Sequence, residues 1–94
     1  MPLGIGQILN KRYRIVQLLH VGGFGAVYLA WDTHLNKNCA VKENLENTPE
    51  GQAQFIREAG LLANLSHPGL PRVFDYFMVP GQGQYLVMDF VEGE

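Results

Sequence analysis

The stretch that decides the fold of this 94-residue sequence is His20-Val21-Gly22-Gly23-Phe24-Gly25-Ala26-Val27-Tyr28-Leu29, a glycine cluster between two apolar segments. Residues 13–19 and 26–31 are rich in β-branched and aromatic side chains, which favours a strand on each side. A dinucleotide-binding fold would place a helix after the glycines, and no Gly-Lys-Ser/Thr follows to make a P-loop. The stretch predicts a glycine-rich hairpin whose backbone N–H groups can approach a phosphate closely. An ordinary hairpin turn with positive φ at Gly22 and Gly23 would give the same pattern.

The rest of the chain predicts one helix and three further strands. Thr48 can cap a helix that starts at Pro49, where a missing N–H costs nothing, and helical spacing continues to about residue 65. We therefore expect an α+β fold, a five-stranded antiparallel sheet with one helix in the order β-β-β-α-β-β. Residues 1–12 would be an N-terminal extension, and residues 13–94 one domain that stops after its last strand. The remaining strands are expected at residues 39–42, 73–78 and 85–89, the last two joined by the turn 80–83.

Composition excludes several classes of function. The net charge of −2, with both signs interspersed, gives no basic face, so we expect no nucleic-acid partner and no membrane contact by this segment. Cys39 is the single cysteine, which excludes an internal disulfide and a cysteine-based metal site and fits a reducing compartment. The start lacks the features of a signal peptide, and no stretch is long and apolar enough to cross a bilayer. We expect a cytoplasmic location and no metal site in this segment.

Lys42 and Glu58 stand at positions from which they could form an ion pair. Alternation along residues 39–42 places Ala40 and Lys42 on one face of a strand. On the helix, Glu58 falls at helical spacing with Phe55 and Leu62, within the apolar stripe that faces the core. An ionised carboxylate there needs a partner, and Lys42 is the natural candidate. Taken singly, Glu58 is better explained as a carboxylate on the helix surface or at the edge of the stripe, and Lys42 as a solvated strand lysine; their occurrence together with the glycine cluster favours the pair.

These residues together make the chain resemble the small, N-terminal lobe of a bacterial-type serine/threonine protein kinase. The resemblance runs from about residue 13 to residue 94 and rests on five motifs in order: the glycine loop 22–28, Ala-Val-Lys at 40–42, Arg-Glu-Ala at 57–59, His-Pro at 67–68, and the strand and hinge 85–93. The resemblance implies a parent protein that transfers the ATP γ-phosphate to serine or threonine of proteins. It also implies that the chain stops at the hinge, with the second, C-terminal lobe absent.

The resemblance also implies a set of site residues. Lys42 would contact the α- and β-phosphates of ATP, and Glu58 would orient Lys42 through an ion pair. The further nucleotide contacts that it implies are backbone groups at Gly22, Gly23, Phe24 and Gly25 over the phosphates, Val27 and Ala40 against the adenine, Met88 as gatekeeper, and backbone groups of Asp89 and Val91 at the adenine edge.

The sequence departs from the family pattern at the first loop glycine, which is His20 here. Histidine tolerates a left-handed backbone less well than glycine, which puts the geometry of the loop at that position in question. An imidazole there could help or obstruct phosphate binding, and we expect it to point outward into solvent. The loop could still close through Gly22 and Gly25.

The sequence also lacks the kinase motifs His-Arg-Asp-x-x-x-x-Asn and Asp-Phe-Gly, which supply the catalytic base and the Mg²⁺ ligands. We therefore expect the 94-residue chain alone to be inactive and Mg²⁺ to require the missing lobe. The alternatives are a pseudokinase or free-standing small lobe that serves as a binding scaffold, and an unrelated β-rich domain. A scaffold has no physical need for an inward lysine–carboxylate pair. Because the truncated lobe would leave apolar surface exposed, we also predict a homodimer or strand exchange.

Overall fold

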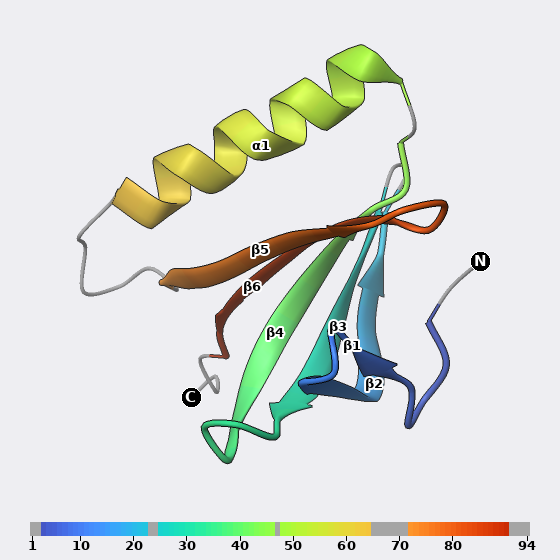
Figure 1. Ribbon diagram of the computed structural model, residues 1–94, viewed down its shortest axis with the longest axis vertical. Helices are drawn as coiled ribbons and strands as arrows, with labels where there is room; N and C mark the ends of the chain where they lie inside the picture. Colours follow the sequence, from blue (N-terminus) through green and yellow to red (C-terminus); the bar gives the residue numbers. More distant parts are fainter. Residues whose placement is uncertain (1–2, 23–24, 47, 65–71, 91–94) are drawn as a thin grey trace.

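The computed structural model describes residues 3–22, 25–46, 48–64 and 72–90. They form one curled antiparallel sheet with a single helix lying across one face (Figure 1). The sheet has the strand order β1-β2-β3-β4-β6-β5, so the final strand of the chain lies inside the sheet between β4 and β5. The elements are β1 Ile8–Leu9, β2 Tyr13–Val21, β3 Gly25–Asp32, β4 Lys37–Asn44, α1 Pro49–Asn64, β5 Val73–Val79 and β6 Gly83–Asp89.

The predicted α+β fold is confirmed, with one strand more than expected. The additional strand β1 has two residues and pairs with the start of β2, Ile8 opposite Arg14 and Leu9 opposite Tyr13. The turn between them uses positive φ at Asn10 and Lys11, 53° and 56°, a conformation that asparagine tolerates better than most residues. A two-residue strand is too short to produce an alternation pattern, so the sequence gives no signal for it.

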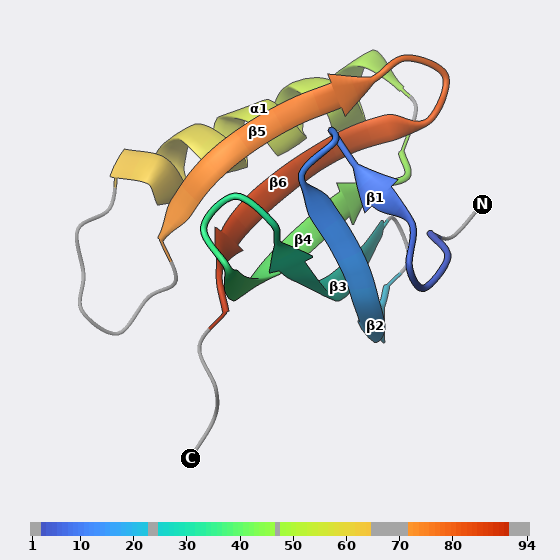
Figure 2. The ribbon, with the colours of Figure 1, turned by 60° about the horizontal axis from the view of Figure 1, so that its bottom comes forward.

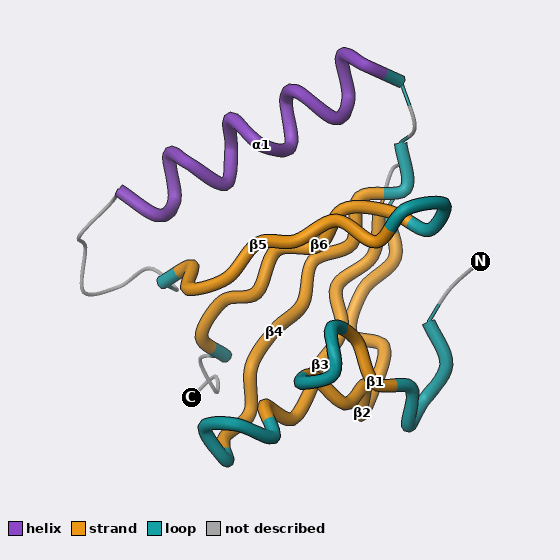
Figure 3. Tube along the Cα trace, viewed as in Figure 1, coloured by secondary structure: helices purple, strands orange, loops and turns teal. Residues whose placement is uncertain are grey.

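The two faces of the sheet have different coverings. One face closes on itself as the sheet curls (Figure 2) and holds the main core, with Tyr13, Ile15, Tyr28, Val41 and Tyr85 fully buried. On the other face a smaller cluster of Phe55, Ala59 and Leu86, flanked by Val73 and Met88, packs the helix against the sheet. The helix contacts β5 and β6, which lie beneath it in Figure 3. The side of this face toward β2 and β3 stays open.

The helix begins as its sequence predicts. The Thr48 hydroxyl accepts a hydrogen bond from the Gly51 N–H at 3.0 Å, and the Thr48 carbonyl accepts one from the Gln52 N–H at 2.9 Å. Pro49 occupies the first helical position, where it sacrifices no hydrogen bond. A side-chain cap of this kind typically stabilises a helix by about 1 kcal/mol. The cap fixes where the helix starts relative to the end of β4, and so helps to determine the position of Glu58 along it.

Candidate functional site

A pocket of about 540 Å³ opens between the glycine hairpin, β4 and the first turns of α1. Its walls come from both sides of the open sheet face, with the hairpin on one side and the helix on the other. The lining contains a lysine, a histidine and several glutamates, so the pocket is rich in charged and polar groups. The lining residues are His20, Gly22, Gly25, Ala26, Val27, Lys42, Glu43, Asn44, Glu46, Gly51, Gln54, Phe55 and Glu58.

Lys42 reaches this pocket because of the strand register. Val27 on β3 lies directly opposite Lys42 on β4, and Lys42 lies opposite Leu86 on β6. Directly opposed residues of antiparallel strands project to the same face. Ala40 lies two residues before Lys42, opposite Met88, and shares that face. The sequence prediction that Ala40 and Lys42 share one face is confirmed, with the buried Cys39 and Val41 on the other.

The structure brings Lys42 and Glu58 together across the pocket. The Lys42 Nζ lies 3.8 Å from the Glu58 Oε1, and Gln54 Nε2 donates a hydrogen bond of 3.3 Å to the Glu58 Oε2. The prediction that Glu58 is buried in the apolar stripe is wrong, because its side chain is 47% exposed and that of Lys42 is 42% exposed. Glu58 lies at the edge of the helix face that contacts the sheet, over the open pocket. The pair can therefore separate or re-form around a ligand at little cost.

The glycine hairpin closes through the two glycines that the sequence analysis singled out. The Gly22 N–H donates to the Gly25 carbonyl at 2.8 Å. Neither residue has positive φ, so the ordinary-turn explanation fails for Gly22. Gly25 is needed for a different reason, because a Cβ at this position would collide with the backbone carbonyl of Glu43. Gly23 and Phe24 lie outside the described residues.

His20 departs from its expected orientation. It is exposed, as predicted, yet its side chain lines the pocket rather than pointing away from it. The His20 Nε2 lies 3.7 Å from the place that a Cβ on Gly22 would occupy, so the imidazole leans toward the glycine hairpin. His20 is paired with Val27, directly after a register shift between Leu18 and His20, and has no positive φ. The chain at this position therefore remains in strand β2, next to an irregularity in its pairing with β3.

Of the residues expected around an adenine, Val27 lines the pocket, whereas Ala40, Met88 and Asp89 lie outside its lining. Ala40 is buried opposite Met88, which packs partly buried against the helix cluster. The Asp89 N–H donates to the Arg72 carbonyl at 2.9 Å, so a contact from Asp89 to an adenine would use its carbonyl oxygen. The Asp89 carboxylate binds Lys37 at 3.1 Å and lies 3.8 Å from the Arg72 Nε. Val91 lies outside the described residues.

A buried carboxylate next to Lys42 escaped the sequence analysis. Glu43 projects to the closed face of the sheet, where it is 1% exposed. The hydroxyls of Tyr85 and Tyr28 donate to its two oxygens at 2.9 Å and 3.3 Å. Burial, reinforced by the hydrogen bond to Glu43, raises the pKa of Tyr85, and burial likewise raises that of Tyr28. Both hydroxyls therefore stay protonated and can donate to Glu43 across the physiological range.

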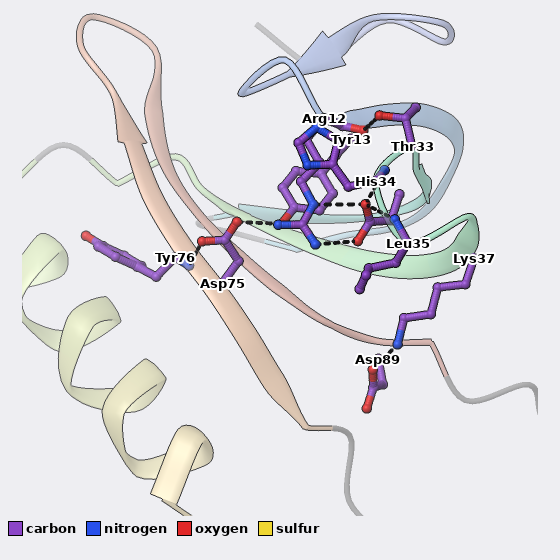
Figure 4. Close-up of polar contacts among 10 residues, drawn as sticks. Arg12, Tyr13, Thr33, His34, Leu35, Lys37, Asp75, Tyr76 and Asp89 are labelled. Carbon is purple, nitrogen blue, oxygen red and sulfur yellow. Dashed lines mark hydrogen bonds and ion pairs between the residues drawn. The ribbon is translucent and has the colours of Figure 1, made fainter.

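A second polar cluster lies at the opposite end of the sheet from the glycine hairpin. Asp32 is buried and receives two hydrogen bonds of 2.9 Å from the Arg12 guanidinium, as well as the backbone N–H groups of His34 and Leu35. Burial opposes ionisation of Asp32, but these hydrogen bonds outweigh it and hold its pKa below the ordinary value. Close by, the Tyr13 hydroxyl binds the Asp75 carboxylate (Figure 4). This cluster fastens the turn after β3 to the start of β2.

Neither a metal centre nor a membrane span emerges from the part of the chain that the structure describes. No group of three or more histidine, cysteine, aspartate or glutamate side chains there is placed to hold a metal ion. The described helix is not long and apolar enough to cross a membrane.

A curled antiparallel sheet crossed by one helix, with a glycine hairpin at the open face, is the architecture of a protein kinase small lobe. The family model described as protein tyrosine and serine/threonine kinase matches residues 13–94. The chain belongs to this family.

Relatives and solved structures agree on this assignment. The chain is 40% identical to the probable serine/threonine-protein kinase YbdM of Bacillus subtilis and 39% identical to the serine/threonine-protein kinase PknA of Mycobacterium tuberculosis. These alignments cover 99% and 96% of the chain but 37% and 22% of the relatives. The apo form of PpkA-294 superposes with a TM-score of 0.86 at 30% identity, over 98% of this chain and 40% of that one. The Mycobacterium tuberculosis PknI kinase domain, as a double mutant, has a TM-score of 0.79 at 28% identity, over 99% of this chain and 37% of that one. The chain thus spans less than half the length of these relatives.

Proposed function

We propose that this chain binds ATP in the pocket between the glycine hairpin and α1, as the nucleotide-binding lobe of a serine/threonine protein kinase. Lys42 binds the α- and β-phosphates, Glu58 orients Lys42, and the backbone of the glycine hairpin covers the phosphates. Val27 and Ala40 contact the adenine, Met88 borders it as gatekeeper, and its edge meets the backbone around Asp89. The observation that carries the proposal is the 3.8 Å approach of the Lys42 Nζ to the Glu58 Oε1 at the wall of this pocket.

The arrangement suits a polyphosphate for two reasons. A lysine held by a single exposed carboxylate keeps donors free for a second anion, because an ammonium group has three N–H bonds. Hydrogen bonds between charged groups are shorter and stronger than neutral ones.

The direct test is a binding titration of the 94-residue chain with ATP, followed by NMR. Replacing Lys42 with methionine removes the charge while keeping the side-chain length, and should weaken ATP binding by about tenfold or more, since a charge-assisted hydrogen bond contributes about 1.5–3 kcal/mol. Lys11→Met is the matched control, because Lys11 lies in the exposed turn between β1 and β2. Its ATP affinity should stay within about twofold of wild type. Equal ATP affinity in Lys42→Met and wild type would refute the proposal.

The complete reaction belongs to the longer protein. There, the γ-phosphate of ATP passes to a serine or threonine hydroxyl of a protein substrate, and a kinase requires for this an aspartate base and Mg²⁺ ligands. None of the motifs that supply them occurs in the 94 residues. The chain alone is therefore inactive as a phosphotransferase in this proposal. A chain that folds but binds no nucleotide would favour the alternative of a pseudokinase or small-lobe scaffold.

A further inference from the structure

His20 occupies a row of side chains that crosses the open face of the sheet. His20 on β2 lies directly opposite Val27 on β3, and Val27 lies directly opposite Lys42 on β4. Directly opposed residues share a face, so His20 and Lys42 project to the same side, one on each flank of Val27. Two strand spacings place their backbones about 10 Å apart. Both side chains line the same pocket.

The imidazole is available to a ligand in that pocket. His20 is exposed, and its Nε2 leans toward the glycine hairpin near Gly22. An imidazole carries one N–H donor when neutral and two when protonated. A hydrogen bond from this ring can therefore reach an anion that sits beside the hairpin, on the side away from Lys42.

The other charged groups of the pocket leave this flank to His20. Lys42 is shared with Glu58 on α1, and Glu46, which also lines the pocket, receives the Thr48 hydroxyl at 2.7 Å. Glu43 is turned to the closed face and holds two tyrosine hydroxyls. On β2 and β3, His20 is the sole ionisable side chain in the lining. A polyphosphate held at one point by Lys42 would meet His20 as a further hydrogen-bonding group on the other side of Val27.

We infer that His20 is a ligand of the phosphate chain of the nucleotide and makes the pocket selective for nucleotides that carry phosphate over the free nucleoside. This inference rests on the proposed function, since it takes the nucleotide to lie in this pocket. His20 contributes a side-chain donor at a position where the family uses a glycine. The selectivity would arise because ATP carries phosphate oxygens that accept a hydrogen bond from this donor, whereas adenosine carries no phosphate.

The test measures dissociation constants of the 94-residue chain for ATP and for adenosine in EDTA, so that no divalent cation contributes. His20→Leu keeps a side chain of similar size and removes the donor. This substitution should raise the dissociation constant for ATP by about fivefold to tenfold, in line with one lost hydrogen bond to a charged group. The dissociation constant for adenosine should stay unchanged. His20→Lys should restore ATP binding and His20→Glu should weaken it further by repulsion. His34→Leu, in the exposed turn after β3, is the matched control and should behave as wild type.

Inorganic tripolyphosphate provides a probe that does not depend on the adenine. In a titration of the wild-type chain, the His20 ring resonances should shift and those of His34 should not. Circular dichroism should show whether each variant is folded. We expect the His20 variants to fold, because the side chain of residue 20 is exposed. His20→Glu gives a second comparison if His20→Leu does not fold.

The possible outcomes separate the two claims. ATP affinity that is unchanged or tighter in both His20→Leu and His20→Glu, while Lys42→Met still weakens it, would overturn the inference about His20 and leave the proposed function intact. A wild-type chain that binds neither ATP nor adenosine would overturn the proposed function and the inference together. An equal loss of ATP and adenosine binding in His20→Leu would also count against His20, because it would point to a change in the pocket as a whole.

Discussion

Two ion pairs in different parts of the molecule, Arg12–Asp32 and Lys42–Glu58, have opposite character. Arg12 and Asp32 form two parallel hydrogen bonds of 2.9 Å, and the Asp32 side chain is fully buried. Lys42 and Glu58 approach only to 3.8 Å, with both side chains more than two-fifths exposed. A buried pair with ideal geometry is costly to break, whereas an exposed pair adds little to stability. The first pair therefore maintains the fold, and the second is free to rearrange around a ligand.

The largest expected effect comes from breaking the buried pair. Asp32→Ala leaves the Arg12 guanidinium without its partner and removes the acceptor for the backbone N–H groups of His34 and Leu35. We expect a loss of about 3 kcal/mol in the free energy of unfolding, measured by urea titration, which is a large part of the stability of a small domain. Asp89→Ala is the matched control, because its partly exposed carboxylate should contribute less than about 1 kcal/mol. Equal losses in the two variants would contradict the comparison.

The pH dependence of stability provides a check on the same pair. Because the pKa of Asp32 is lowered in the folded chain, its stabilising contribution is complete above the ordinary aspartate pKa of about 3.9 and is lost as the pH falls through the folded value. The urea midpoint of the wild type should therefore fall more steeply below about pH 4 than that of Asp32→Asn. Parallel curves would show that the Arg12 pair does not lower this pKa.

An intermediate effect on stability is expected at the glycine hairpin, where the Gly25 backbone packs closely against the Glu43 carbonyl of β4. Gly25→Ala would place a methyl group against the Glu43 carbonyl, forcing β3 and β4 apart at a cost of roughly 1–3 kcal/mol. Gly60→Ala is the control, since a Cβ at that helical position would meet no atom within 4 Å. That change should stabilise the helix by about 0.5–1 kcal/mol. If both substitutions changed the urea midpoint in the same direction, the steric explanation would be wrong.

The smallest effect is expected for the exposed pair. In a double-mutant cycle of Lys42→Met and Glu58→Gln, the coupling free energy for unfolding should stay below about 0.5 kcal/mol. The same cycle on Arg12→Met and Asp32→Asn should give a clearly larger coupling. A coupling of about 1 kcal/mol or more between Lys42 and Glu58 would mean that this pair also serves the fold.

The sequence predicted most of what depends on local pattern. The hairpin, the Thr48 cap and the shared face of Ala40 and Lys42 follow from alternation and capping rules, and all three are confirmed. The proximity of Lys42 and Glu58 was predicted as well, but Glu58 was expected to face the core and is instead about half exposed. Helical spacing indicates which side of a helix is apolar, and does not indicate where the sheet beneath it ends.

The features that sequence analysis missed depend on contacts between distant residues. Arg12 and Asp32 are 20 positions apart and meet only because β1, β2 and β3 pair in a particular register. Glu43 appears as an ordinary polar residue after a strand lysine, until the tyrosines of two other strands surround it. One signal was available: Asp32 begins a turn, and aspartate at such positions commonly accepts hydrogen bonds from the following backbone.

The adjacent residues Lys42 and Glu43 help to fix the register of β4, because each of them suits only one face of the sheet. Successive residues of a strand project to opposite faces, so a slip of one residue exchanges the two faces completely. Such a slip would bring a carboxylate into the pocket and bury an ammonium group among the tyrosine hydroxyls that now donate to Glu43, without a carboxylate at that position to pair with it. A one-residue register slip of β4 would therefore be unfavourable on both faces of the sheet. If a deletion of one residue in the turn 33–36 shifted β4 by one position, every side chain of the strand would project to the opposite face.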